Sequence, residues 1–479
     1  MDARNGIEDM LHPLLGRYLK APDWVKASAG RAYRALPDSL KLGGAYEEFR
    51  ALVAGEHSVG PMARLEATLA WAIETVPAYA QYKPLLRGGR DPREILAALP
   101  ITDKLDIKHD LERYLSRALP PSARLETFTG GSTRHPMRFF LHKHVTRPKE
   151  QAFMQDFRAR VGATEADLVL AMRGRIVPTA AQPDGRLWML EPIRRQLIVS
   201  CDHLERRYMP RYAEALSQHR PAIVEAFPSA LYPLARWLRD HPMPEFTGNV
   251  RGVMLFSENV DAAQLAVIRQ VFPCPVIAHY GHSERVLMAG TMPGDDRYFF
   301  WPQYGYLELV DERGRTITEP GRMGFVVGTS FDNRVMPFVR YRTGDLAVLS
   351  ASAHPELPAF PACDRIVGRL QEFVVCRDRR LVSITAIGAA HFPEMAQADA
   401  IQYEQHAPGK LLLKLASDQA LDPTALTRIC AAVERRLQGG CHVEARQVAK
   451  IERTPRGKAR MILQHIDVRP YFTDAGHDA

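Results

Sequence analysis

Apolar residues recur at three- and four-residue intervals near the start of the chain. In the stretch ARLEATLAWAIETV they are Leu65, Leu69, Ala72, Ile73 and Val76, and a helix would carry all five on one face. Proline and glycine mark the ends of this and similar stretches. The pattern therefore predicts a helical N-terminal segment over residues 1–95.

The pattern changes after residue 95, where short β-rich runs alternate with helical ones. The stretches ALYPLARWLRD and DAAQLAVIRQVF have helical periodicity and lie between predicted strands. Such alternation is typical of an α/β sheet domain, so we expect an α/β body over residues 96–369. The predicted strands are Leu168–Met172, Val253–Phe256, Val276–Ala278, Tyr306–Val310 and Phe325–Val327.

Residues 370–479 have the pattern of a small α+β domain. EFVVC and RRLVSIT are predicted strands, and IQYEQHAPGKLLLKLAS is a predicted hairpin that turns at Ala407-Pro408-Gly409. The predicted helix TALTRICAAVERRLQ follows and ends at Gly439-Gly440. A large α/β body with a small mobile C-terminal domain suits an enzyme that closes over its substrate.

The composition excludes several classes of protein. The chain has 479 residues, of which 46% are hydrophobic and 25% charged, and no apolar run approaches the roughly 18 to 20 residues of a membrane span. The first twenty residues lack the pattern of a secretory signal, so we expect a cytoplasmic protein. The six cysteines form no CxxC pair, which argues against a disulfide framework and a compact zinc site, and favours reduced thiols.

The charge balance bears on possible partners. The formal net charge is +8 and the pI is about 9.1, but lysine and arginine are interspersed with acidic residues rather than gathered in one tail or stripe. Anionic small substrates such as nucleotides explain this excess better than nucleic acid does.

The first chemical signal is the segment TFTGGSTRHP at 127–136. Small residues in a tight loop allow backbone N–H groups to approach phosphate oxygens, and hydroxyl side chains add donors. No lysine follows the glycines, so this is not the phosphate loop of kinases and GTPases. By itself such a segment is more often a plain surface turn than a phosphate-binding loop. The candidate phosphate-binding residues are Thr129, Gly130, Gly131, Ser132 and Thr133.

Further motifs follow this loop along the chain: HYGHSE at 279–284, RYRTGD at 340–345, VGR at 367–369 and RTPRGK at 453–458. In this order the five motifs resemble those of the adenylate-forming superfamily, which includes acyl-CoA synthetases and the adenylation domains of peptide synthetases. The segments LPITDK at 99–104, Pro228-Ser229 and MPFVRYRTGD at 336–345 support the resemblance, which spans residues 95–465. The nearest branch is that of phenylacetate–CoA ligase-like proteins, particularly those found with capsular-polysaccharide genes.

This resemblance implies a fold and a reaction. The fold would be a large multi-layer α/β adenylate-forming body with a small mobile α+β C-terminal domain. The reaction would join a carboxylic acid to the AMP part of ATP, release pyrophosphate, and pass the acyl group to a second substrate. ATP and Mg²⁺ would be required, and CoA is one possible acceptor.

The resemblance also implies the residues that bind nucleotide. Asp345 would accept hydrogen bonds from the two ribose hydroxyls, as one carboxylate can. Tyr280 and Gly281 would flank the adenine, by ring stacking and by close backbone approach. The remaining candidates are Ser283 as a donor to the α-phosphate, Ser257 and Glu258 on the adenine side, and Arg369 at ribose or phosphate.

Three further residues have implied roles in the chemistry. Glu284 would be a magnesium ligand, because a hard carboxylate oxygen suits a hard cation. Lys458 would be the catalytic residue, because a mobile ammonium can stabilise the charge that gathers as a carboxylate attacks the α-phosphorus. Gln371 occupies the hinge position before the C-terminal domain, where relatives more often carry Asp or Lys.

Two departures from the family pattern concern the phosphate loop and the acceptor site. Arg134 and His135 stand where many relatives have Gly and Lys. The segment CRDRRLVSIT at 376–385 lacks the RGxNxFP pattern that helps to form the thioester site of phenylacetate ligases. The acyl acceptor therefore stays open among CoA, an amine and a sugar-linked group. The resemblance implies that His279 and His282 border the acyl pocket. There they either contact the substrate or make hydrogen bonds that only hold the structure together.

Two alternatives from other classes remain at this stage. One is a catalytically impaired member of the family that binds nucleotide or acts as an assembly module. The other is a phosphoryl-transferring kinase, which the missing loop lysine disfavours. Neither the carboxylic acid, the pathway nor the oligomeric state follows from the residues.

Overall fold

The computed structural model describes residues 18, 21–55, 60–129, 137–173, 177–181, 185–201, 203–369, 372–387, 398, 400–417, 419–453 and 459–472. The chain divides into two compact units. The first comprises Met1–Arg160, Pro192–Arg194 and His279–Arg365. The second comprises Val161–Glu191, Arg195–Ala278 and Ile366–Ala479. Two of the boundaries between them fall within strands β8 (Val276–Gly281) and β14 (Ala362–Arg369).

The first unit begins with helices, as the periodicity predicts. In α6 (Pro61–Thr75) the residues Leu65, Leu69, Ala72 and Ile73 are fully buried, and they belong to one apolar cluster with Val339. The predicted apolar face is thus confirmed. The other helices of this unit are α3 (Asp23–Ala35), α4 (Asp38–Leu42), α5 (Gly44–Val53), η2 (Pro77–Leu86), α7 (Pro92–Ala98), α8 (Lys104–His109), η3 (Leu111–Tyr114), η4 (Pro121–Ala123) and α9 (Thr146–Ala159).

The strands of the first unit form a hairpin and part of a large sheet. The hairpin pairs β1 (Arg124–Phe128) with β2 (Arg138–His142). In the sheet the strand order is β11-β12-β13-β14-β10-β9-β8, and neighbours such as β11 with β12 and β8 with β9 are antiparallel. The strands not yet bounded are β9 (Met288–Met292), β10 (Asp295–Phe300), β11 (Gly305–Val310), β12 (Met323–Ser330) and β13 (Tyr341–Leu349).

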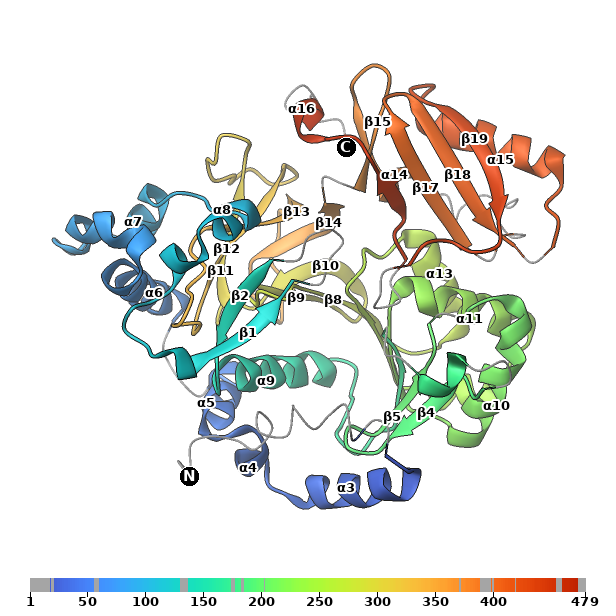
Figure 1. Ribbon diagram of the computed structural model, residues 1–479, viewed down its shortest axis with the longest axis horizontal. Helices are drawn as coiled ribbons and strands as arrows, with labels where there is room; N and C mark the ends of the chain where they lie inside the picture. The colour runs from blue at the N-terminus through green and yellow to red at the C-terminus, as the bar shows by residue number, and fades with distance from the viewer. Residues whose placement is uncertain are drawn as a thin grey trace. The chain divides into compact units, whose positions relative to one another are not determined.

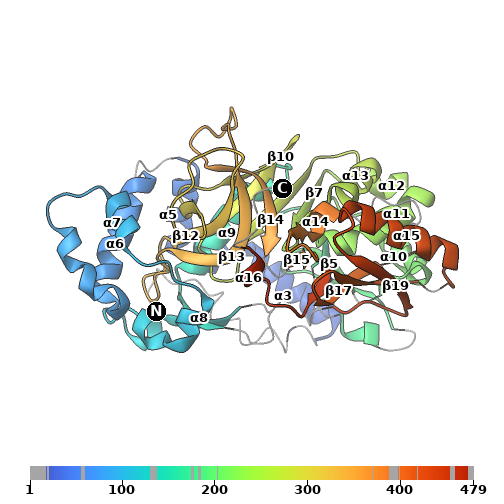
Figure 2. The same cartoon turned by 90° about the horizontal axis from the view of Figure 1, so that it is seen from above.

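The second unit contains the βα alternation that the sequence predicts. Its strand order is β7-β6-β3-β5-β4, parallel from β7 to β5 and antiparallel at β4. Helices α11 (Pro228–Asp240) and α13 (Ala262–Val271) lie side by side (Figures 1 and 2). The other elements are β3 (Val169–Met172), β4 (Trp188–Glu191), β5 (Gln196–Val199), β6 (Ile223–Ala226), β7 (Gly252–Phe256), η5 (Pro178–Ala181), η6 (Arg206–Tyr208), α10 (Met209–His219) and α12 (Pro244–Thr247).

The C-terminal part of the second unit is the small α+β arrangement that we expect. Four strands are ordered β19-β18-β17-β20, and Ile429 and Val433 of helix α15 (Pro423–Arg436) belong to the apolar core of this part (Figure 1). The predicted hairpin is formed by β17 (Ala400–Ala407) and β18 (Lys410–Ala416). The remaining elements are β15 (Phe373–Val375), β16 (Leu381–Ser383), α14 (Ile384–Ile387), β19 (His442–Val448), β20 (Ile462–Gln464) and α16 (Arg469–Phe472).

The observed elements confirm the fold class and the predicted strands and helices of the body. The five predicted strands of the body correspond to β3, β7, β8, β11 and β12. The two predicted helices of the body correspond to α11 and α13. All six cysteines are free thiols. Within the described ranges, no helix is long and apolar enough to cross a membrane.

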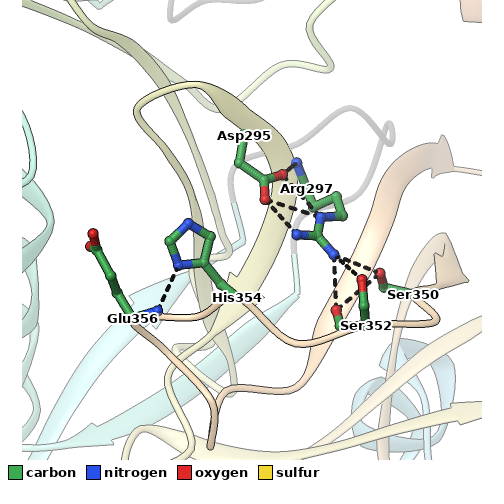
Figure 3. A network of polar contacts seen from close by, with 6 residues as sticks. All are labelled: Asp295, Arg297, Ser350, Ser352, His354 and Glu356. Carbon is green, nitrogen blue, oxygen red and sulfur yellow. Dashed lines mark hydrogen bonds and ion pairs between the residues drawn. The ribbon is translucent and has the colours of Figure 1, made fainter.

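A polar network holds β10 to the loop that follows β13 (Figure 3). The guanidinium of Arg297 donates to both carboxylate oxygens of Asp295, which lowers the pKa of that carboxyl. Arg297 Nη1 also donates to the hydroxyl and carbonyl oxygens of Ser352, at 2.6 and 2.9 Å. In the same loop His354 accepts from the backbone N–H of Glu356 and packs its ring edge-on against Phe299. These contacts fix a loop conformation, and we assign them a structural role.

A buried lysine ties α9 to two loops of the first unit. Lys149 is 2% exposed, and its Nζ donates to the carbonyl oxygens of Tyr304 and Phe331 at 2.6 and 2.9 Å. Asp332 lies 3.1 Å away and is shared with Arg64. Burial lowers the pKa of Lys149 to about 8, against the opposing effect of Asp332. Lys149 therefore joins three segments that are distant in sequence.

Replacing Lys149 by methionine is expected to lower the free energy of unfolding near pH 7 by about 3 kcal/mol, because two buried carbonyls lose their donor. In the wild type the unfolded chain binds the ammonium proton of Lys149 more tightly than the folded chain does. Folding therefore becomes more favourable as pH rises from about 8 to 10.5. Between about pH 7.5 and pH 9.5 the wild type should gain about 2 kcal/mol relative to Lys149→Met. Urea unfolding at both pH values measures this difference, and parallel pH profiles would contradict it.

Candidate active site

The HYGHSE segment begins in β8 and ends in a tight turn. The backbone N–H of Arg285 donates to the carbonyl of His282 at 3.0 Å, and Arg285 has a left-handed backbone with φ of 54°. The ring nitrogen Nε2 of His282 accepts from the backbone N–H of Val286 at 3.2 Å. His282 thus closes the turn that places Ser283 and Glu284, which agrees with its reading as hydrogen-bonded structure.

Asp345 meets the HYGHSE segment through Tyr280. The Tyr280 hydroxyl donates to Asp345 Oδ2 at 2.8 Å, across 65 positions of sequence. Thr343 Oγ1 accepts from the Asp345 backbone N–H at 3.2 Å, and Gly344 between them has φ of 85°, which explains why glycine occupies this position. Both Tyr280 and Asp345 are buried, at 9% and 7% exposure. Two of the predicted nucleotide-binding residues are therefore in direct contact.

Glu284 is held in a similar way by the other motif. The Tyr341 hydroxyl donates to Glu284 Oε1 at 2.8 Å, and the two residues are 1% and 8% exposed. Tyr280 of the first motif thus holds the carboxylate of the second, and Tyr341 of the second holds the carboxylate of the first. This reciprocal pair of hydrogen bonds fixes the two acidic side chains, Asp345 and Glu284, relative to one another.

The sequence predicts no role for Tyr341. Its place in the RYRTGD motif, two and four residues before Thr343 and Asp345, was the available signal, because alternate residues of a strand share a face. Tyr280 is predicted from the sequence to act through its ring. The ring packs edge-on against Phe300 at 5.8 Å between centroids, and the hydroxyl bond to Asp345 is an additional function.

An ion pair anchors the start of the RYRTGD motif. Arg340 donates to both carboxylate oxygens of Glu308, at 2.9 and 3.2 Å, and to the carbonyl of Leu99. Burial raises the pKa of Glu308, which the neighbouring Arg340 opposes. Thr102 of the LPITDK segment exchanges backbone hydrogen bonds with residues 340 and 342. The LPITDK and RYRTGD motifs are therefore adjacent, and Arg340 has a structural position.

The predicted phosphate loop connects β1 to β2. Its first residue, Thr129, donates from its backbone N–H to the carbonyl of Met137, and its Oγ1 accepts from the Met137 backbone N–H, both at 2.9 Å. These bonds close the base of the loop. Gly130, Gly131, Ser132 and Thr133 lie outside the described residues, as do Arg134 and His135.

The other predicted residues belong to the second unit. Ser257 follows β7 with φ of 64°, and Glu258 accepts from the backbone N–H and hydroxyl of Ser229, both at 3.0 Å. Glu258 thus caps the start of α11, a contact that the sequence pattern does not predict. The backbone N–H of Arg369 donates to Glu372 at 3.2 Å. Gln371 and Lys458 lie outside the described residues.

The chemistry of the residues that the fold brings together suits a nucleotide and its cation. Asp345 Oδ2 is oriented by a phenol, and a carboxylate can accept two hydrogen bonds from a vicinal diol. Among the described residues, the Glu284 carboxylate accepts one hydrogen bond, from the Tyr341 hydroxyl to Oε1. This bond orients a hard oxygen ligand of the type that Mg²⁺ prefers. The donor chemistry of the site therefore fits a magnesium–nucleotide complex.

Solved structures with the same fold identify the architecture. A 2-hydroxyisobutyryl-CoA ligase in the postadenylation state with R3-HIB-AMP matches with a TM-score of 0.64 and 18% identity, over 86% of this chain and 90% of that chain. The same ligase with 2-HIB-AMP matches with a TM-score of 0.61, the same identity and the same coverage. McyG A-PCP complexed with phenylalanyl-adenylate matches with a TM-score of 0.50 and 14% identity, over 71% of this chain and 65% of that chain.

These likenesses show that the chain has the fold of enzymes whose structures contain acyl-adenylates. No protein-family model matches the chain, and no curated protein matches it in sequence.

Proposed function

We propose that the protein activates a carboxylic acid with ATP, forming an acyl-adenylate and pyrophosphate, and then transfers the acyl group to an acceptor. The observation that carries this proposal is the reciprocal bracing of Asp345 by Tyr280 and of Glu284 by Tyr341. These hydrogen bonds join two motifs that the adenylate-forming superfamily also has, in a chain with that fold.

Asp345 binds the ribose hydroxyls in this proposal, and Tyr280 and Gly281 border the adenine. Preorganised acceptors and donors lose little entropy when a ligand binds, which is the benefit of holding the Asp345 carboxylate in place. Ser283 donates to the α-phosphate. Ser257, Glu258 and Arg369 are the remaining proposed nucleotide-binding residues, and Glu258 also caps the first turn of α11.

The phosphate-binding loop from Thr129 to Thr133 holds the β- and γ-phosphates, and Arg134 strengthens that grip as a charged donor. Glu284 holds Mg²⁺, which neutralises phosphate charge when bound. Lys458 stabilises the charge at the α-phosphorus as the carboxylate attacks.

The proposed domain organisation is a helical N-terminal segment over 1–95, an α/β nucleotide- and acyl-binding body over 96–369, and a C-terminal domain over 370–479 that swings about Gln371 and carries Lys458. The motifs support a phenylacetate–CoA ligase-like enzyme of the capsular-polysaccharide subgroup, acting in the cytoplasm. Its acceptor is CoA, an amine or a sugar-linked group.

Pyrophosphate exchange tests the proposal directly. The full chain is incubated with ATP, Mg²⁺, labelled pyrophosphate and a panel of carboxylic acids, and acid-dependent label in ATP is the expected result. Mass spectrometry should identify AMP as the nucleotide product once an acceptor is supplied. Nucleotide binding without exchange for any acid would instead indicate an assembly module. ADP as the product would indicate a kinase.

Replacing Glu284 by glutamine is expected to raise the Mg²⁺ concentration for half-maximal exchange by about tenfold, because an amide oxygen is a weaker ligand for a hard cation. Tyr341→Phe should shift the same parameter in the same direction, by about threefold, because it removes only the hydrogen bond that orients the carboxylate. Exposed Glu312→Gln is the matched control and should leave the Mg²⁺ dependence unchanged. Wild-type Mg²⁺ dependence in Glu284→Gln would remove this residue from the metal site.

A further inference from the structure

Three side chains that belong to none of the motifs discussed above gather at one end of the C-terminal sheet. Glu404 and His406 are two residues apart on β17, so they share a face of the strand. β20 pairs with β17 in parallel, with Glu404 opposite Leu463 and Gln405 opposite Gln464. The backbone N–H of His465 donates to the carbonyl of Gln405 at 3.0 Å, which continues this register. His465 therefore lies beside His406.

The donor atoms of these side chains converge on one point. Nε2 of His406 lies 3.0 Å from Glu404 Oε1, and Nε2 of His465 lies 3.1 Å from the same oxygen. All three candidate ligand atoms lie within 4.8 Å of one another. The two imidazole rings are stacked, with centroids 4.0 Å apart and planes inclined by 7°. Two imidazole nitrogens thus face a single carboxylate oxygen.

Side chains on the opposite face of β17 and β20 hold the backbone beneath this cluster in place. Gln405 is fully buried, and its side-chain amide accepts from the backbone N–H of Val375 and donates to the carbonyl of that residue, at 2.8 and 2.9 Å. Gln464 donates from Nε2 to Gln405 Oε1 at 2.9 Å. The residues that alternate with Glu404, His406 and His465 therefore fix the two strands, as the support of a preformed site requires.

We propose that Glu404, His406 and His465 form a binding site for a divalent transition metal, of which Zn²⁺ is the representative. Two imidazoles and one carboxylate are a ligand set that such metals accept, with water in the remaining positions. Ligands at about 2.0–2.1 Å in tetrahedral geometry are about 3.3 Å apart, close to the present nitrogen–oxygen separations. Binding requires each ring to turn about its Cβ–Cγ bond so that its lone pair points at the ion.

The ligand atoms of this site favour different metals from those that bind with a nucleotide. Imidazole nitrogen favours Zn²⁺, Ni²⁺ and Cu²⁺, whereas Mg²⁺ prefers an all-oxygen shell and retains its water. Millimolar Mg²⁺ should therefore not compete. The site is independent of the proposed function, because none of its three residues belongs to the nucleotide-binding motifs.

Lys414 modulates the charge of the cluster. Its Nζ lies 2.7 Å from Glu404 Oε2, the oxygen that does not face the two rings. This ammonium orients the carboxylate but weakens its attraction for a cation. Removing it is expected to tighten metal binding, which provides a variant that changes affinity in the opposite direction to loss of a ligand.

Calorimetric titration of the full chain with ZnCl₂ and NiCl₂ tests the proposal. His406→Ala and His465→Ala should each weaken the assigned binding event by more than about tenfold, and Glu404→Gln should also weaken it. Lys414→Met should tighten it by about threefold. His442→Ala is the matched control, because His442 is an exposed histidine of the same sheet and contacts Glu434, yet lies outside the cluster.

Equal affinities in the wild type, His406→Ala and His442→Ala would overturn the proposal, as would the absence of binding at micromolar Zn²⁺. His406 is 66% exposed, so its replacement should leave the fold intact, and circular dichroism checks this. Should His465→Ala fail to fold, His406→Asn provides the decisive comparison. Pyrophosphate exchange in His406→Ala should remain at the wild-type level, so the two proposals can fail separately.

Discussion

Lys458→Ala is expected to lower the rate of acyl-adenylate formation by about 100- to 1,000-fold while leaving ATP binding nearly unchanged. Two anionic groups, the substrate carboxylate and the α-phosphate, must approach one another in this step. A lysine ammonium at that point stabilises charge that develops only in the transition state, so its loss affects the rate more than the affinity. Pyrophosphate exchange measures the rate, and equilibrium titration with ATP measures the binding.

Lys450→Ala is the matched control for this prediction. Lys450 is an exposed lysine of the same segment and carries the same charge, but it is outside the RTPRGK motif. Its replacement should leave exchange within about twofold of the wild type, since an exposed charge contributes little. Near-normal exchange in Lys458→Ala would refute the catalytic assignment. Lys458→Arg should have little more activity than Lys458→Ala, because the planar guanidinium of arginine does not substitute for a compact ammonium.

Asp345→Ala is expected to weaken ATP binding by about 100-fold, because two hydrogen bonds from the ribose to a charged acceptor are lost. Tyr280→Phe retains the ring and removes the hydroxyl that donates to Oδ2 at 2.8 Å. It should weaken binding less, by about threefold to tenfold, since only the orientation of the carboxylate is affected. Titration with ATP gives both affinities.

The 2′-deoxy analogue of ATP separates a ribose contact from general damage to the site. If Asp345 accepts from the 2′-hydroxyl, the wild type should bind the analogue more weakly than ATP, and Asp345→Ala should discriminate much less between the two. Because Asp345 is 7% exposed, Asp345→Asn is a useful second variant that preserves shape. Unchanged ATP affinity in folded Asp345→Ala and Asp345→Asn would exclude this residue from the ribose site.

Local periodicity was sufficient to predict most of the secondary structure. The apolar face of α6, the strands β3 and β7, and the hairpin of β17 and β18 are each set by residues close in sequence. Side-chain alternation and turn residues act over a few positions, so these elements are visible without tertiary structure. The order of the motifs likewise predicted the fold that the solved structures share.

The site depended on contacts that local patterns do not contain. Tyr341 donates to Glu284, which lies 57 positions away in the sequence, and Tyr280 donates to Asp345, which lies 65 positions away. The sequence indicated which carboxylates to consider, but only the fold decided which hydroxyls hold them. Likewise, the sequence did not predict that both carboxylate oxygens of Glu258 accept hydrogen bonds from Ser229.

The sequence by itself determined the helices, the strands, the chemical types of the candidate residues and their order along the chain. Tertiary structure alone decided the reciprocal tyrosine bonds, the burial of Lys149 and the meeting of His406 with His465. The physical reason is that periodicity and turn preference are short-range properties of the chain. Hydrogen bonds, desolvation and metal-ligand geometry depend instead on which distant segments the packed core brings together.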